Sequence, residues 1–113
     1  MINGVIKVGL SKEEIEIIGD GSAKKISVRE LPYAISKKYN GGFTVSATLR
    51  AAAFAGIAIM STGGIGGIHY GYNDSLDASS DLWEMVRTEM CIRDSINTVS
   101  NTLIGKFKSM VTI

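Results

Sequence analysis

Apolar residues in the first part of the chain form short segments that glycines separate. Residues 4–9 (GVIKVG) are a short apolar segment that ends at glycine, which is typical of a strand. Ser11 and Glu14 then form a capping box, because a hydroxyl residue precedes a glutamate by three positions. Apolar residues follow up to the GDG string at residues 19–21. The pattern predicts a strand followed by a helix.

A second helix is predicted from about Pro32 to Tyr39. Residues 27–30 (SVRE) repeat the capping pattern. The apolar face of the segment comes from Leu31, Ala34 and Ile35. Proline is tolerated only in the first turn of a helix because it has no N–H to donate, so the helix should begin near Pro32. The NGG string at residues 40–42 predicts a break in regular structure.

The next segments predict a helix, a strand, a loop and a last helix. Residues 44–56 (TVSATLRAAAFAG) are rich in alanine and favour a helix, in which Arg50 is an isolated charge. Residues 57–60 (IAIM) predict a buried strand before a glycine-rich loop. Ser79 or Ser80 can cap a helix that runs to about residue 86. Helices that alternate with short strands indicate an α/β fold, and we expect part of an α/β/α sandwich with packed helices.

Composition narrows the class of protein. The chain has 113 residues, 45% hydrophobic and 20% charged, which fits one small globular domain or a piece of a larger one. The net charge of +1 gives no electrostatic signal for nucleic acid. The longest apolar run, residues 51–60, is too short to span a bilayer, and the N-terminus shows no signal peptide. A single cysteine excludes an internal disulfide, so we expect a cytoplasmic protein that binds neither nucleic acid nor membrane.

Residues 61–82 (STGGIGGIHYGYNDSLDASSDL) carry the strongest chemical signal. Glycines allow backbone N–H groups to come close to an anion, and aspartates supply hard oxygen ligands for a divalent cation. A phosphate beside a metal ion predicts chemistry on a phosphorylated small molecule. The alternatives are a tight turn for the glycines and a favourable interaction with a helix dipole for Asp77 and Asp81, whose i, i+4 spacing would place them on one helix face.

Four blocks of sequence, in order, resemble pseudouridine-5'-phosphate glycosidase over residues 2–88. They are IKVGLSKEEIEIIG, KKISVRELPYAI, GGFTVSATLRAAAFAGIAIMSTGGIGGIHYG and DASSDLWEM. The resemblance implies an α/β/α enzyme, a homotrimer that uses manganese or another divalent metal. It also implies reversible cleavage of the C–C glycosidic bond of pseudouridine 5'-phosphate to uracil and ribose 5-phosphate. A lysine of the family attacks the sugar and forms an imine, and a glutamate handles the proton.

The resemblance also implies site residues. Asp77 matches the metal-ligand aspartate, and a Mn²⁺ or similar ion is expected there. The matches to substrate-binding residues are Lys25, Thr44, Val45, Thr62, His69, Ser79, Ser80 and Asp81. We expect these residues to hold the sugar phosphate.

Two catalytic groups of the family have no counterpart among the 113 residues. Residues 90–95 (MCIRDS) stand where the lysine element is expected, and the family glutamate belongs to a segment before the first block. We therefore expect no turnover from this chain. Residues 1–88 are interpreted as a partial glycosidase domain and residues 89–113 as an unrelated or artefactual tail, with TEMCIRDS (residues 88–95) forming neither strand nor helix. The alternatives are a non-catalytic fragment that binds sugar phosphate or metal, and another metal-dependent sugar-phosphate enzyme.

Overall fold

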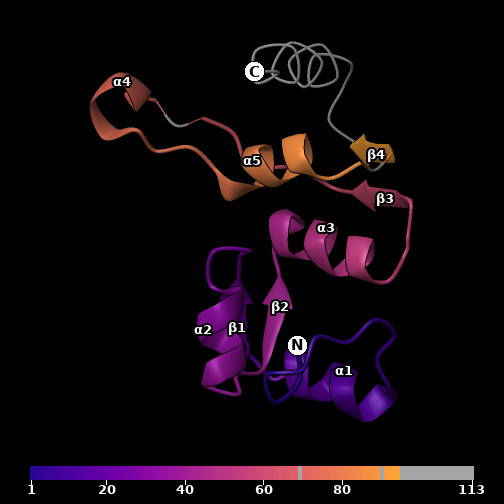
Figure 1. Cartoon of the computed structure of the whole chain (residues 1–113). Coiled ribbons are helices and arrows are strands. Elements are labelled where there is room, and N and C mark those ends of the chain that lie inside the picture. The colour runs from indigo at the N-terminus through magenta and orange to yellow at the C-terminus, as the bar shows by residue number, and fades with distance from the viewer. Residues whose placement is uncertain (69, 90, 95–113) are drawn as a thin grey trace.

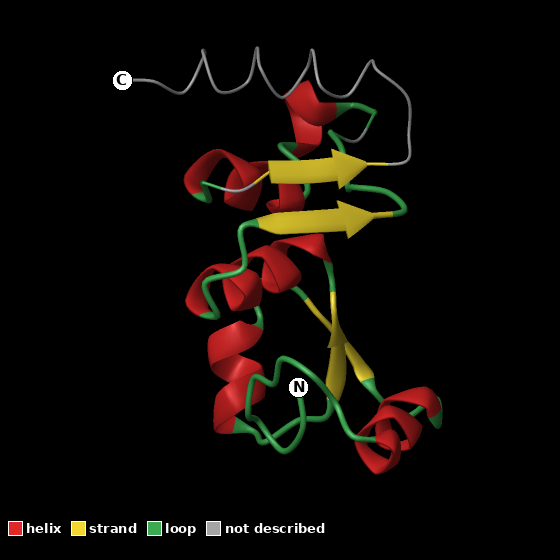
Figure 2. Cartoon of the chain, turned by 90° about the vertical axis from the view of Figure 1, so that its right-hand side faces the viewer, coloured by secondary structure: helices red, strands yellow, loops and turns green. Residues whose placement is uncertain are grey.

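The computed structural model describes residues 1–68, 70–89 and 91–94. Within them, short strands form two separate parallel pairs, β1 with β2 and β3 with β4. The strands are β1 (Lys24–Ile26), β2 (Gly41–Phe43), β3 (Ile59–Thr62) and β4 (Cys91–Asp94). Helix α3 (Val45–Phe54) lies between the two pairs and contacts β2, β3 and α5 (Ser80–Arg87) (Figures 1 and 2). Helices with short parallel strands confirm the predicted α/β class.

Helix α1 (Lys12–Gly19) begins at the predicted capping box. The Glu14 N–H donates to Ser11 Oγ at 3.3 Å, and the Ser11 N–H donates to the Glu14 carboxylate at 3.0 Å. The strand predicted over residues 4–9 is wrong. The backbone instead turns back through a bridge between Ile2 and Val5, with Gly4 in the left-handed region at φ +76°. A strand needs a ladder of backbone hydrogen bonds, and within the described chain this segment forms only that isolated bridge and a bond from the Gly4 N–H to the Tyr39 carbonyl.

Helix α2 (Leu31–Ser36) begins one residue before Pro32, so the proline falls in its first turn as predicted. The helix ends before Tyr39 because Lys38 adopts a left-handed conformation, with φ +54°. The second capping box is wrong. The Ser27 N–H donates to the Glu30 carboxylate at 2.8 Å, but Glu30 is itself the N-cap, so the motif makes a turn before the helix.

The break predicted at residues 40–42 is also wrong, because β2 (Gly41–Phe43) starts there and pairs with β1. A Cβ atom at Gly41 would lie 2.3 Å from Ile26 Cδ1 and 2.5 Å from the Lys24 carbonyl oxygen. Glycine is therefore present because the two strands approach closely, and not because the chain turns. The main core lies where β1, α2 and α3 meet, and consists of Met1, Ile26, Leu31, Ala34 and Ala47.

Strand β3 lies two residues beyond the predicted segment and is not buried. Ile59 is 71% exposed, because no described element covers that face of the strand. Strand β4 (Cys91–Asp94) corrects the interpretation of TEMCIRDS as neither strand nor helix. It pairs in parallel with β3, whose open backbone edge can hydrogen-bond any extended segment. The predicted tail beyond residue 94 lies outside the described residues, and no helix within them is long and apolar enough to cross a membrane.

Candidate functional site

Asp81 connects three parts of the fold. It lies in the first turn of α5, where Ser79 is the N-cap as predicted and Ser79 Oγ accepts a hydrogen bond from the Asp81 N–H at 3.2 Å. The Asp81 side chain is buried. One carboxylate oxygen accepts from the Ser46 N–H at 2.8 Å, and the other accepts from the Gly66 N–H at 2.9 Å. A single carboxylate thus fixes the start of α3, the glycine loop and the start of α5 to one another.

The glycine loop packs closely on the start of α5. A Cβ atom at Gly66 would lie 2.1 Å from Ser79 Oγ and 3.1 Å from Asp81 Oδ2, so only glycine fits there. Thr62 stabilises the loop from the other side, because its hydroxyl donates to the Gly64 carbonyl at 3.0 Å. The loop backbone is therefore held between Thr62 and the first turn of α5.

These contacts shape a cavity of about 480 Å³. Its lining combines one cation, one hydrogen-bonded carboxylate, hydroxyl groups, two apolar side chains and half-buried loop backbone, from Lys25, Phe43, Thr44, Val45, Gly64, Gly66, Ser79, Ser80 and Asp81. Lys25 lines this cavity together with Thr44 and Val45 at the N-terminal end of α3, which carries a partial positive charge. A cation beside a helix N-terminus is an arrangement that suits a bound anion, and the Ser46 and Gly66 N–H groups of this wall already donate to Asp81.

The structure brings together six of the predicted substrate-binding residues and leaves others apart. Thr62 lies behind the cavity wall, bonded to Gly64. Asp77 is exposed, does not line the cavity, and its N–H donates to Ser75 Oγ at 3.2 Å. Its expected place on one helix face with Asp81 is wrong, because α5 begins only at Ser80. His69 lies outside the described residues.

Two residues of the site were not predicted from the sequence. Phe43 lines the cavity at the end of β2. Ser46 is fully buried, and its hydroxyl bonds those of Thr44 and Ser80 at 2.9 and 3.0 Å. The signal for Ser46 was its place two residues after Thr44 in the first turn of a helix, where a side chain can reach the end of a neighbouring helix.

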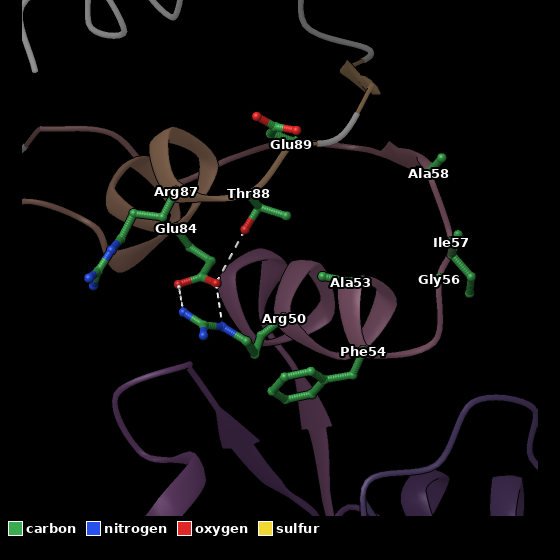
Figure 3. Close-up of a pocket in the computed structure, with 10 residues that line it drawn as sticks. All are labelled: Arg50, Ala53, Phe54, Gly56, Ile57, Ala58, Glu84, Arg87, Thr88 and Glu89. Carbon is green, nitrogen blue, oxygen red and sulfur yellow. Dashed lines mark hydrogen bonds and ion pairs between the residues drawn. The ribbon is translucent and has the colours of Figure 1, made fainter. Parts of the chain in front are cut away.

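A second cavity of about 600 Å³ lies at the other end of α3 (Figure 3). There Glu84 points from α5 towards α3 and is 2% exposed. Arg50 donates to both of its carboxylate oxygens, at 2.6 and 3.0 Å, and the Thr88 hydroxyl donates to one of them at 3.3 Å. The hydrogen bonds that Arg50 donates to Glu84 raise the pKa of Arg50 above its ordinary value. The isolated charge in α3 therefore pairs with a buried carboxylate and joins α3 to α5.

The fold and the first cavity define an α/β protein with a small cavity lined by a glycine loop, a lysine and the N-terminal end of a helix. Comparison with known proteins narrows this class. A family model described as "Indigoidine synthase A like protein" matches residues 1–95, and the chain belongs to this family.

Curated relatives support the resemblance found in the sequence. The chain is 47% identical over 94 residues to the pseudouridine-5'-phosphate glycosidase of Escherichia coli K12, and 43% identical over 93 residues to that of Deinococcus radiodurans. Each match covers 81% of this chain and 30% of the relative, so the chain spans about a third of the length of these proteins. The resemblance to pseudouridine-5'-phosphate glycosidases is confirmed.

Solved structures agree with the fold. An indigoidine synthase A-like protein from Thermotoga maritima matches with a TM-score of 0.79 at 32% identity. The prealnumycin C-glycosynthase AlnA, solved in complex with ribulose 5-phosphate, matches with a TM-score of 0.81 at 31% identity. Each match covers 97% of this chain and 37% of the other, so the described elements correspond to one part of a larger enzyme fold.

Proposed function

We propose that this chain forms the sugar-phosphate-binding part of a pseudouridine-5'-phosphate glycosidase. The reaction would cleave the C–C glycosidic bond of pseudouridine 5'-phosphate with water, giving uracil and ribose 5-phosphate. The observation that carries the proposal is the cavity in which Lys25, Thr44, Val45 and residues 79–81 converge on the glycine loop. The related C-glycosynthase was solved with ribulose 5-phosphate, a five-carbon sugar phosphate of matching chemistry.

The residues that line this cavity have different proposed roles in binding the sugar phosphate. Lys25 would bind the phosphate as a point charge, with the N-terminal turn of α3 contributing its partial positive charge. Thr44 and Ser80 would contact sugar hydroxyls, and Val45 would pack against the sugar. Asp81 would act mainly by holding the walls in place, since both of its oxygens already accept backbone hydrogen bonds. Thr62 and His69 complete the predicted set.

Two neighbouring lysines offer a matched test of the phosphate site. Calorimetry should detect binding of ribose 5-phosphate to the chain, and absence of binding would refute the proposal. Lys25→Ala should weaken binding by about ten-fold or more, because a hydrogen bond to a charged group is lost. Lys24→Ala is the control, since the Lys24 ammonium lies 5.2 Å from the Tyr39 ring centroid and outside the cavity lining. Equal effects of the two variants would show that binding depends on the net charge of the chain and not on Lys25 in particular.

The predicted metal ion remains part of the proposal. The described residues contain no group of three histidine, cysteine or acidic side chains that could hold a metal, so Asp77 offers one carboxylate and not a closed cage. Asp77 does not line the cavity, so an ion of the Mg²⁺ or Mn²⁺ type would reach the substrate phosphate through the several waters that such an ion keeps. The ion would supply charge stabilisation for the phosphate. Mn²⁺ should tighten ribose 5-phosphate binding, and Asp77→Ala should remove that effect; an unchanged effect would exclude Asp77.

We also propose that the 113 residues bind without turnover, act in the cytoplasm, and derive from a family that assembles as homotrimers. An imine requires a lysine amine that reaches the sugar C1', and in this proposal Lys25 binds the phosphate instead. An assay of uracil release from pseudouridine 5'-phosphate should therefore give no product, whereas calorimetry gives binding. Uracil release would contradict this proposal, and sedimentation would report the oligomeric state.

A further inference from the structure

A buried serine joins the two hydroxyl groups that line the candidate pocket. Ser46 is 0% exposed, and its Oγ lies 2.9 Å from Thr44 Oγ1 and 3.0 Å from Ser80 Oγ. Thr44 and Ser80 line the cavity, whereas Ser46 does not. The Val28 N–H donates to the same Ser46 oxygen at 3.3 Å. Ser46 thus lies behind the cavity wall as the common partner of both hydroxyls.

The hydrogen count at Ser46 restricts what its two neighbours can do. A serine hydroxyl has one hydrogen to donate and two lone pairs to accept. The Val28 N–H occupies one lone pair, so Ser46 accepts a hydrogen from one neighbouring hydroxyl and donates its own hydrogen to the other. Either Thr44 donates to Ser46 and Ser46 donates to Ser80, or the order is reversed. In both cases one cavity hydroxyl keeps a free hydrogen, and the other offers only lone pairs.

We propose that Ser46 is a positioning residue that makes the Thr44–Ser80 wall of the pocket selective for sugar hydroxyls over phosphate oxygens. A sugar hydroxyl both donates and accepts, so it can use the free hydrogen and the lone pairs together. A phosphate oxygen that carries no proton only accepts, so it gains from one of the two groups. The inference rests on the proposed function, because it assigns the sugar of a sugar phosphate to this wall and leaves the phosphate to Lys25.

Ser46→Ala tests the proposal by comparing two probes, ribose 5-phosphate and inorganic phosphate, in calorimetry with the whole chain. Without the Ser46 hydroxyl, the hydroxyl groups of Thr44 and Ser80 rotate freely. The wall then no longer holds one hydrogen-bond donor and one acceptor in fixed directions. Binding of ribose 5-phosphate should weaken about five-fold, the effect of one ordered hydrogen bond. Binding of inorganic phosphate should stay within about two-fold. The proposal would be overturned if Ser46→Ala weakened the binding of both probes equally, or of neither.

The two ends of the hydroxyl chain give a second test that holds even when Ser46→Ala does not fold. Thr44→Val and Ser80→Ala should each reduce the preference for ribose 5-phosphate over inorganic phosphate. The double variant should lose no more than either single variant, because the three hydroxyls act as one unit. Additive losses would overturn the proposal. Ser36→Ala is the control, since that hydroxyl is exposed and bonds the Tyr33 carbonyl on α2.

The two proposals fail in different ways. If the wild-type chain does not bind ribose 5-phosphate, the proposed function fails and the role of Ser46 fails with it. If the wild-type chain binds and the preference is the same in Ser46→Ala, only the role of Ser46 fails.

Discussion

Replacing Arg50 by alanine should destabilise the chain strongly, because it leaves a buried carboxylate without its partner. Glu84 is 2% exposed and its two oxygens accept from Arg50, and the Thr88 hydroxyl donates to one of them. Removing one member of a buried ion pair typically costs about 3–5 kcal/mol. The Arg50 side chain is 37% exposed, so water partly screens the pair, and we expect a loss of about 2–3 kcal/mol in the free energy of unfolding.

Urea denaturation followed by far-ultraviolet circular dichroism measures this loss. Arg50→Lys should cost about 1 kcal/mol, because the charge remains but the two-point hydrogen bonding is lost. Arg87→Ala is the matched control: it also lines the second cavity, but its guanidinium lies 5.8 Å from the Trp83 ring centroid, and its loss should cost about 0.5 kcal/mol.

The double variant Arg50→Met with Glu84→Leu separates the two possible reasons for the loss. Replacing both charges by apolar residues of similar size removes the unpaired carboxylate, so most of the stability should return. A loss below about 0.5 kcal/mol for Arg50→Ala would show that water reaches Glu84 freely and would refute the argument. A double variant as unstable as Arg50→Ala would refute the assignment of the loss to the unpaired charge.

Three further predictions concern the glycine loop, the Asp81 bridge and the first helix. Gly66→Ala should abolish ribose 5-phosphate binding because its Cβ would overlap Ser79, whereas Gly67→Ala, with nothing within 4 Å, should bind normally; equal calorimetric titrations would contradict this. Asp81→Ala should lower the free energy of unfolding by about 3 kcal/mol in urea, since two backbone N–H groups lose a charged acceptor; a change near zero would show that water replaces it. Hydrogen bonding, first to Lys7, lowers the pKa of Glu14 below its ordinary 4.5, so the bond should stabilise α1 above that pH and be lost as the pH falls through the lowered pKa. An NMR titration of Glu14 should show the low pKa in the wild type and a higher one in Lys7→Gln, and identical values would exclude the contact.

Elements with a local cause were predictable from the sequence. The box formed by Ser11 and Glu14 lies within four residues, and helix α1 begins there. Ser79 similarly caps α5 through a contact two residues away. By contrast, β1 and β2 form because they pair with each other, with Lys24 opposite Gly41. The two residues are far apart in the sequence, so the local sequence around either one does not reveal the pairing. The glycines of β2 therefore resembled a turn.

The candidate site divides in the same way. The family blocks gave Lys25, Thr44 and residues 79–81, and the structure gathers them in one cavity. The sequence could not predict that Asp81 binds the Ser46 N–H, because 35 residues separate them and the contact depends on how α3 and α5 pack. The residue types and their order therefore predicted which residues form the candidate site. Which of them line the cavity and which hold its walls in place depends on how the helices pack.

Helix α3 lines the candidate pocket at its first turn and carries the Arg50–Glu84 pair further along, and it contacts β2, β3 and α5. Within the described residues, α3 is therefore a helix that packs against a strand of each pair. Amide hydrogen exchange should slow along the whole of residues 45–54 when a sugar phosphate occupies the pocket, including at Phe54, more than two turns along the helix from Val45. Local unfolding of α3 would remove the packing of both strand pairs in one step.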